Sequence, residues 1–460
     1  MIEILTYQDL IALGEYEYLR MEFIESAIRE HETSTLYRTA MDAEDYYRHR
    51  NPTIMRYQKM VYNQLGKAVP DVYSANNKIP SNLYHYFVTQ EVQYLLGNGV
   101  SFGSIDKDRL GKNFDKAIRD AAIKALNGSV SFGFWNVDHL EIFGVSKGGT
   151  DGCEPAFIPI YDEETGALRS GIRYWRIDSG KPLRATLYEE NGYTEYIKRK
   201  DDDMRVFQEK RPYKLTIRTS EAGGNEIVAG TNYPTFPIVP LWNSTRQSEI
   251  VGGRGTLDAY DLMASSLVNN VDEGNLIYWV LKNCGGMDDL DDAKFVERLK
   301  TTHVAHADGD DGAQVESHSV EAPYQANEAA LDRLRSQLFD DYMALDVKAI
   351  ANGAATATQI QAAYEPLNSK TDDFEYQVTE FIQGILALAG LEDTPTYTRS
   401  LIVNRQEEVQ MVLQAAEYLD EDYTSKKILE ILGDADQADE IIERRQAEET
   451  SRFTNEEDEE

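Results

Sequence analysis

Apolar positions in the first 125 residues recur with the three- and four-residue spacing of helices, so this region is expected to be mainly helical. A helical pattern runs over 42–64 and changes register at Pro52. A second helix is expected within 76–102, where two glycines at 97 and 99 would end it. Four residues form the apolar face of that second helix: Leu83, Phe87, Tyr94 and Leu95.

From residue 128 to about 240 the pattern changes to short alternating apolar and polar runs. The segments SVSFGFWNV (129–137) and ATLYEENGYTEYIKRK (185–200) alternate as half-buried strands do. The sequences DEETG and EENG lie between such runs where hairpin turns would lie. We therefore expect an antiparallel sheet here, followed by a proline-rich extended segment at 231–244.

Two long helical patterns follow, at 255–281 and 327–346. They flank 282–326, which is rich in Gly and Asp and contains strand-like pieces, so an antiparallel helix pair with a small module at its far end is expected. The apolar stripe of the first helix is narrow and its other faces are small and polar, which suits packing beside neighbouring helices. The glycine-rich VGGRGT at 251–256 is expected to be a flexible entry to that helix rather than a dinucleotide loop.

The stretch NGAATATQIQAAYEPLNSK, residues 352–370, places a loop of tiny residues before another long helical pattern that ends at Gly390. Pro366 lies inside this pattern, so a kink or break is expected there. The loop could be a phosphate cradle, an ordinary helix start capped by Thr356 or Thr358, or a hinge. No Lys or nucleotide motif accompanies it, which removes support for the cradle and leaves the other two interpretations compatible.

Charge and composition limit the classes of protein that this chain can belong to. Among 460 residues, 46 Lys or Arg oppose 80 Asp or Glu, for a net charge of -34. Tight nucleic-acid binding by a free monomer is therefore not expected, because phosphate contacts need surplus basic residues. The length favours two or more domains, and only two cysteines argue against a disulfide framework and for a reducing compartment.

Neither a membrane segment nor enzyme chemistry is expected. The N-terminus lacks the basic region of a secretory signal, and the longest apolar run, 381–391, is too short to cross a bilayer. No GxxxxGK[ST], GxSxG or HExxH motif occurs. We therefore expect no enzyme activity, no catalytic residue, no metal site and no cofactor. Residues 401–460 are acidic and helical in pattern, and the terminal NEEDEE is expected to be a solvated, disordered tail.

The order of these elements, with three local sequences, resembles the portal proteins of tailed bacteriophages, which connect head and tail. The three sequences are NNKIPSNLYHYFVTQEVQYLLGNGVSF, FPIVPLWNS with GTLDAYDLMASSLVNN, and NGAATATQIQAAYEPLNSK. The likeness covers about 80–390 and is greatest to the branch found in long-tailed phages of Gram-positive hosts.

This resemblance implies an α+β, mainly α, portal fold that assembles as a ring. Its parts would be a wing (1–245), a first stem helix (246–281), a clip (282–326), a second stem helix (327–346), a tunnel loop (347–356), a kinked wing helix (357–392) and an acidic helical crown with a tail (393–460).

The resemblance also implies a role and partners. Twelve copies would form a ring at one capsid vertex, and double-stranded DNA would pass non-specifically through its channel during packaging and ejection. The terminase large subunit, a head-completion or adaptor protein, and capsid and scaffolding proteins would bind the ring, with no membrane partner. The protein would lie in the virion and, during assembly, in the host cytoplasm. The alternatives are another viral neck or capsid-assembly protein without a channel, and a host enzyme of unknown class.

Candidate site residues follow from the same resemblance. An acidic channel wall would repel DNA, while a few basic residues would supply weak contacts that salt screens. The tunnel loop and hinge would comprise Lys348, Asn352, Gly353, Ala354, Ala355 and Thr356, with the helix kink at Pro366. Candidate channel contacts are Arg333, Arg335 and Lys348, and candidate clip contacts are Lys294, Arg298 and Lys300.

Overall fold

A computed structural model describes most of the chain. It covers residues 5–62, 66–71, 74–147, 154–178, 180–200, 202–219, 225–274, 277–282, 314–319, 324–348, 357–400 and 405–433, with short pieces up to 445. Within these residues, no helix has the length and apolarity needed to cross a membrane.

Helices dominate the N-terminal region, as predicted. They are α1 (Tyr7–Ala12), α2 (Glu17–Thr33), α3 (Thr35–Tyr47), α4 (Pro52–Arg56), α5 (Leu83–Leu96), the 3-10 turn η1 (Lys107–Leu110) and α6 (Phe114–Gly128).

The prediction of a helix across 42–64 is wrong beyond α4. The left-handed backbone of His49, at φ 58°, follows the end of α3, and Pro52 then begins α4 at a position where its missing N–H is tolerated. After α4, β1 (Met60–Tyr62) and β2 (Ala68–Pro70) form a hairpin instead of more helix. Three β-compatible residues in β1 outweigh the helical spacing.

The central sheet confirms the predicted strands, although β4 is buried on both of its faces instead of alternating, whereas β9 alternates for most of its length. Its eight strands run in the order β10-β9-β8-β7-β6-β5-β4-β13, antiparallel except between β5 and β6. The strands are β4 (Val130–Asn136), β5 (His139–Gly144), β6 (Ala156–Tyr161), β7 (Leu168–Trp175), β8 (Leu183–Glu189), β9 (Gly192–Lys198), β10 (Arg205–Arg211) and β13 (Ile238–Trp242). The proline-rich segment supplies the edge strand β13, where Pro240 is tolerated. A separate hairpin joins β11 (Lys214–Thr219) to β12 (Asn225–Thr231).

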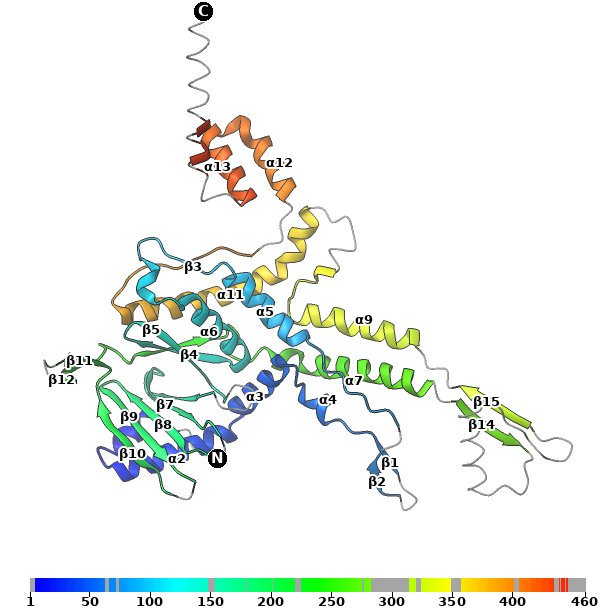
Figure 1. Cartoon of the computed structure of the whole chain (residues 1–460), viewed down its shortest axis with the longest axis horizontal. Helices are drawn as coiled ribbons and strands as arrows, with labels where there is room; N and C mark the ends of the chain where they lie inside the picture. The colour runs from blue at the N-terminus through cyan, green and yellow to red at the C-terminus, as the bar shows by residue number, and fades with distance from the viewer. Residues whose placement is uncertain are drawn as a thin grey trace, which may run out of the picture.

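Two groups of helices pack on this sheet, α6 and α11 on β4 and α2 on the strands β6 to β9 (Figure 1). The Ser131 hydroxyl on β4 donates to the Ala121 carbonyl of α6 at 2.8 Å. On the same face of β4, Gly133 leaves room for α11 (Ala357–Ala389), because a Cβ there would lie 2.5 Å from the Phe381 ring. A second buried cluster joins α2 to the strands β6 to β9, with Ile24 and Ile172 fully buried.

Two long helices leave the sheet side by side (Figure 1). They are α7 (Ile250–Gly274) and α9 (Tyr324–Asp341), and the hairpin of β14 (Ile277–Lys282) and β15 (Gln314–Ser319) lies at their far end. The helix pair is therefore confirmed, and β15 confirms one strand-like piece of the predicted module, most of which lies outside the described residues. The predicted helix across 277–281 is wrong, because β-favouring residues there pair with β15. The VGGRGT segment is also not a flexible entry, since α7 already contains it.

The helix α11 is continuous through Pro366, and its ribbon changes direction along its length (Figure 1). A short pairing of β16 (Thr396–Tyr397) with β3 (Val100–Ser101) returns the chain to the body. The C-terminal region is helical where described, with α12 (Arg405–Ala415), the 3-10 turn η2 (Ala416–Tyr418) and α13 (Glu421–Leu432). The expected tail NEEDEE lies outside the described residues.

Candidate functional site

A polar stripe on α7 binds an extended segment of the N-terminal region. Three backbone N–H groups donate to it: Ser81 to Asp261 Oδ1 at 2.9 Å, Ile79 to the Ser265 hydroxyl at 3.0 Å, and Asn77 to Asn269 Oδ1 at 2.7 Å. The three acceptors are buried and four residues apart, so they share one helix face. They satisfy backbone donors that would otherwise lack partners. The sequence predicted that the small, polar faces of this helix pack beside neighbouring helices. In the structure, one of these faces binds an extended segment of the same chain.

The start of α4 also binds this face of α7. The Asn51 amide donates to Asp261, and the Thr53 hydroxyl donates to Asp258 Oδ2 at 3.0 Å. Burial raises the pKa of Asp261, while the Asn51 and Ser81 donors oppose that shift. Both ends of residues 51–81 are therefore anchored to α7.

A buried ion-pair centre joins three other parts of the fold. Lys370 Nζ on α11 lies 2.7 Å from Glu91 Oε2 on α5 and 2.8 Å from Glu249 Oε2, directly before α7. The three side chains are only 14%, 2% and 12% exposed, respectively. Two carboxylates and one ammonium leave one excess negative charge, and burial raises the pKa of Glu91 to about 7 although Lys370 lowers it. Burial lowers the pKa of Lys370, but Glu91 and Glu249 outweigh it and raise that pKa.

The ion-pair centre lies against the end of α9. Lys370 Nζ donates to the Tyr342 carbonyl at 3.4 Å, and the Tyr342 ring packs on Gly253 of α7. A Cβ at Gly253 would lie 2.3 Å from that ring, so only glycine permits this approach. One glycine of VGGRGT therefore has a packing role within a helix.

The entrance to the predicted tunnel loop is held by side chains from α5 and α9. Leu345 N–H donates to Gln90 Oε1 at 2.9 Å, and Gln90 Nε2 donates to the Leu345 carbonyl at 3.0 Å. Arg335 donates to both carboxylate oxygens of Asp346, at 2.8 and 3.0 Å. Asp346 Oδ1 in turn accepts from Lys348 N–H at 3.0 Å. The backbone of 345–348 is thus fixed by side chains from two helices.

The segment that follows the predicted tunnel loop, the start of α11, also contacts Leu345. Leu345 packs in a buried cluster with Tyr364 and Leu367 of α11 and with Tyr94 of α5. The Tyr94 and Tyr364 rings stack with centroids 5.6 Å apart. The described segments on either side of residues 349–356 therefore meet in this one cluster, through Leu345 before them and α11 after them.

The structure separates the predicted basic residues. Arg333 is exposed on α9, whereas Arg335 binds Asp346 and lies 4.7 Å from the Phe339 ring centroid. Arg335 and Lys348 line one mostly apolar hollow of about 660 Å³ beside the loop entrance, together with residues from α5 and α7. The predicted loop residues Asn352, Gly353, Ala354, Ala355 and Thr356 and the predicted clip residues Lys294, Arg298 and Lys300 lie outside the described residues. Pro366 lies on the exposed side of α11.

Sequence reasoning missed Gln90 and the ion-pair centre, although a signal was present. Glu91 lies four residues from Phe87 and from Leu95, on the apolar face of α5, and Lys370 lies on a corresponding face of α11. A charged residue within an apolar stripe indicates a buried partner of opposite sign.

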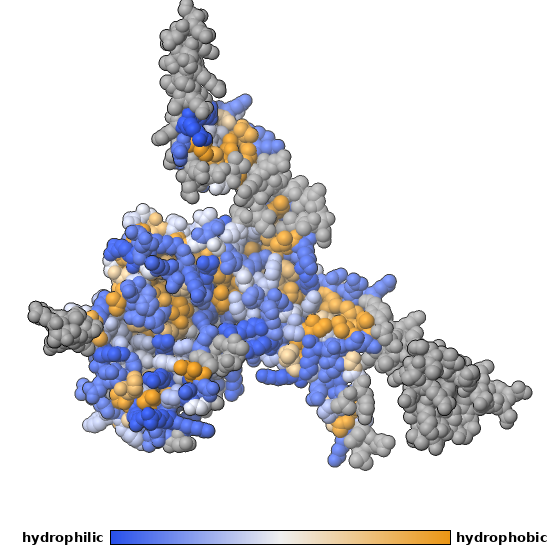
Figure 2. Space-filling view, viewed as in Figure 1, coloured by the Kyte–Doolittle hydropathy of each residue, from blue (hydrophilic) through white to orange (hydrophobic). Residues whose placement is uncertain are grey.

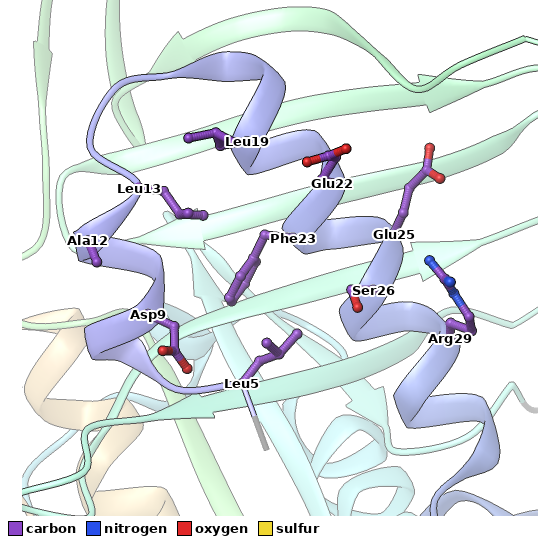
Figure 3. Close-up of a pocket in the computed structure, with 10 residues that line it drawn as sticks. All are labelled: Leu5, Asp9, Ala12, Leu13, Leu19, Glu22, Phe23, Glu25, Ser26 and Arg29. Carbon is purple, nitrogen blue, oxygen red and sulfur yellow. The ribbon is translucent and has the colours of Figure 1, made fainter. Parts of the chain in front are cut away.

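A second hollow, of about 680 Å³, lies between α1 and α2 at the N-terminus (Figure 3). Leu13 and Phe23 face it, with Asp9, Glu22 and Arg29 around its edge. Across the part of the chain that the structure describes, no group of His, Cys, Asp or Glu is arranged to hold a metal ion. The hollow has mixed apolar and acidic walls.

A protein-family model described as "Phage portal protein, SPP1 Gp6-like" matches residues 27–451. The chain belongs to this portal protein family. Portal proteins are structural proteins of the phage virion. The family match confirms the resemblance, and together with the observed mixture of helices and strands it confirms the expected α+β portal fold.

Two relatives carry the name portal protein. That of Clostridium phage phiCD119 is 23% identical over 401 residues, covering 82% of this chain and 85% of the relative. That of Bacillus phage SPP1 is 24% identical over 399 residues, covering 80% and 76%. Both genera are Gram-positive, in agreement with the expected branch.

A solved structure, the "Neck of empty GTA particle computed with C6 symmetry", also matches. It is 10% identical, covers 76% of this chain and 90% of its own, and has a TM-score of 0.41.

Proposed function

We propose that this portal protein forms a ring of twelve copies at one capsid vertex, with a central channel for DNA packaging and ejection. The observation that carries the proposal is the loop frame, in which Leu345 and Tyr364 meet in one buried cluster beside the end of α9. A segment of small residues attached to such a frame can approach an axis shared by many copies. The frame can remain rigid while that segment moves.

The parts of the proposed ring follow the sequence boundaries. The helices α7 and α9 form the stem, with β14 and β15 at the clip end, where the terminase large subunit docks. Residues 347–356 form the tunnel loop, and α11 continues into the wing. The sheet and N-terminal helices form the rest of the wing, and 393–460 form the crown and tail. A head-completion or adaptor protein and the capsid and scaffolding proteins bind the ring, which assembles in the host cytoplasm and remains in the virion.

Electrostatics support a conduit rather than a tight binding site. A chain with a net charge of -34 repels DNA, so the duplex is not held along the channel. Arg333, which is exposed on α9, and Lys348, which is exposed at the loop entrance, supply weak contacts. Arg335 has a carboxylate partner already and shapes the loop entrance.

Negative-stain images of the purified full chain test this function. Rings with a central hole are expected, and their mass, measured for single particles, gives the number of copies. Particles without a channel, or many copies in each capsid, would instead favour a neck or capsid-assembly protein. Absence of rings at every salt concentration and protein concentration tested would overturn the proposal.

A further inference from the structure

A hairpin arm, described by residues 56–62, 66–71 and 74–78, projects from the body of the protein beside α7 (Figure 1). Its strands β1 and β2 form a two-stranded sheet of their own. All of β1 is exposed: Met60 to 53%, Val61 to 40% and Tyr62 to 81%. A two-stranded hairpin is marginally stable alone in water, and gathered exposed apolar residues mark interaction surfaces. The arm is therefore built to lie against another surface.

The base of the arm is rigid. Lys78 Nζ donates to the Met55 carbonyl at 2.7 Å across the two chain segments that form the base. The Asn77 amide donates to Asp272 Oδ2 of α7 at 2.6 Å, in addition to the backbone bond of Asn77 to Asn269. These contacts set the direction of the arm without covering β1.

Charge narrows the choice of partner. The arm contains four Lys or Arg and one Asp, a net charge of +3 in a chain whose net charge is -34. Its partner should therefore combine acidic and apolar residues. The helices α7 and α9 have this composition, with three Arg against eight Asp or Glu and a net charge of -5. They also expose Leu262, Val268 and Val271, each between 37% and 45%.

Hydrophobic residues are visible both on the arm and over the α7 and α9 pair (Figure 2). We propose that the arm of one copy docks on α7 and α9 of a second copy. The inference rests on the proposed ring, in which every copy has a neighbour. It assigns to the arm the role of holding adjacent copies together.

Cross-linking within mixed rings tests which surface the arm contacts. Tyr62 is replaced by the photo-reactive p-benzoylphenylalanine in the full chain, and rings are assembled from that protein and a ¹⁵N-labelled copy without the substitution. Cross-links from residue 62 to labelled peptides of α7 or α9 are expected. Rings that yield cross-links only within one chain, or only to other regions, overturn the docking and leave the ring intact. A wild-type chain that forms no rings overturns the proposed function as well.

A pair of matched variants tests the energetic role. V61D/Y62D should raise the protein concentration needed for half-maximal ring assembly by about tenfold or more, measured by mass photometry, because two apolar contacts become charged. I11D/Y16D changes two exposed apolar residues, Ile11 in α1 and Tyr16 directly before α2, and should leave that concentration within about twofold. Both should keep the monomer's thermal unfolding unchanged. If V61D/Y62D assembles like the wild type, the docking is overturned. If this variant assembles normally but loses duplex DNA binding, the arm contacts DNA instead.

Discussion

Gln90 and Leu345 exchange two hydrogen bonds, one in each direction, between a side-chain amide and a backbone peptide group. The amide uses both of its hydrogen-bonding ends, as a backbone partner in a sheet would. Because Gln90 belongs to α5 and Leu345 follows α9, this pair fixes the chain shortly before the proposed tunnel loop to the body of the protein.

Replacing Gln90 with Met should release this point while keeping the volume of the side chain. Loss of two hydrogen bonds to a half-buried backbone should lower stability by about 1–3 kcal/mol. Hydrogen exchange of the Leu345 amide should rise, whereas Gln93→Met, on the exposed side of α5, should leave it unchanged. Equal exchange in the two variants would contradict the role of Gln90.

Arg333 and Arg335 offer a comparison of two neighbouring basic residues with different surroundings. Arg335→Gln should lower the stability by about 1–2 kcal/mol and loosen residues 345–348, because Asp346 loses a charged partner. Arg333→Gln should leave stability unchanged, since its side chain is exposed.

Duplex DNA association with assembled rings, measured over a range of salt concentrations, separates the two residues further. Arg333→Gln should reduce the salt dependence by about one phosphate contact per contributing subunit. A change in stability for Arg333→Gln, or no change for Arg335→Gln, would count against this division of roles.

Glu91 should make stability depend on pH in an unusual direction for a carboxylate. Its ordinary pKa of 4.5 rises to about 7 in the folded protein, so the folded state binds this proton more tightly than the unfolded chain. The contribution of Glu91 is therefore full below pH 4.5 and is lost as pH rises through 7.

Glu91→Gln removes this titration, and Glu380→Gln on the exposed side of α11 is its control. Relative to Glu91→Gln, the wild type should lose roughly 2 kcal/mol of unfolding free energy between pH 5 and pH 8. Denaturant titrations at several pH values measure that difference. A difference that stays constant over this range would show that Glu91 does not take up a proton.

Lys370→Met should be among the most damaging single changes. It leaves Glu91 and Glu249 buried near each other without a cation, and removal of one partner from a buried ion pair costs about 3–5 kcal/mol. Adding Glu91→Gln to Lys370→Met should recover part of the loss, whereas Lys112→Met at an exposed position should have little effect. Denaturant unfolding of the wild type, Lys370→Met, Glu91→Gln and the double variant gives the coupling energy. A double variant no more stable than Lys370→Met would contradict the expected recovery.

The sequence predicted the features of this fold that depend on local periodicity. Alternation predicted the strands from β4 to β9, and the long helical pattern that ends at Gly390 predicted α11. Local periodicity misled where a tertiary partner decided the outcome, as at 277–282, which pairs with β15, and at 60–62, which pairs with β2. These short apolar runs fit either a helix or a strand until their partner is known.

The frame around the loop could not be predicted from spacing, because its members come from distant parts of the chain. Gln90 is 255 residues from Leu345, and nothing in the neighbourhood of Gln90 specifies that partner. Glu91 and Lys370 were easier to predict from the sequence, since each interrupts an apolar stripe and each therefore requires a buried counterion. Pairing Glu91 with Lys370 rather than another base still required the fold.

Gly353→Pro tests whether the proposed tunnel loop must move. Proline restricts φ and removes a backbone N–H, so the change should impair DNA packaging while rings still assemble, because Gln90, Asp346 and Tyr364 hold the frame without residue 353. Gly353→Ala is the matched control, since it adds one methyl group and keeps the N–H. Phage complementation with each variant, scored as packaged DNA per capsid, makes the comparison. Normal packaging with Gly353→Pro would refute the hinge, whereas equal loss with both variants would indicate that space near the channel axis, rather than backbone motion, requires glycine at this position.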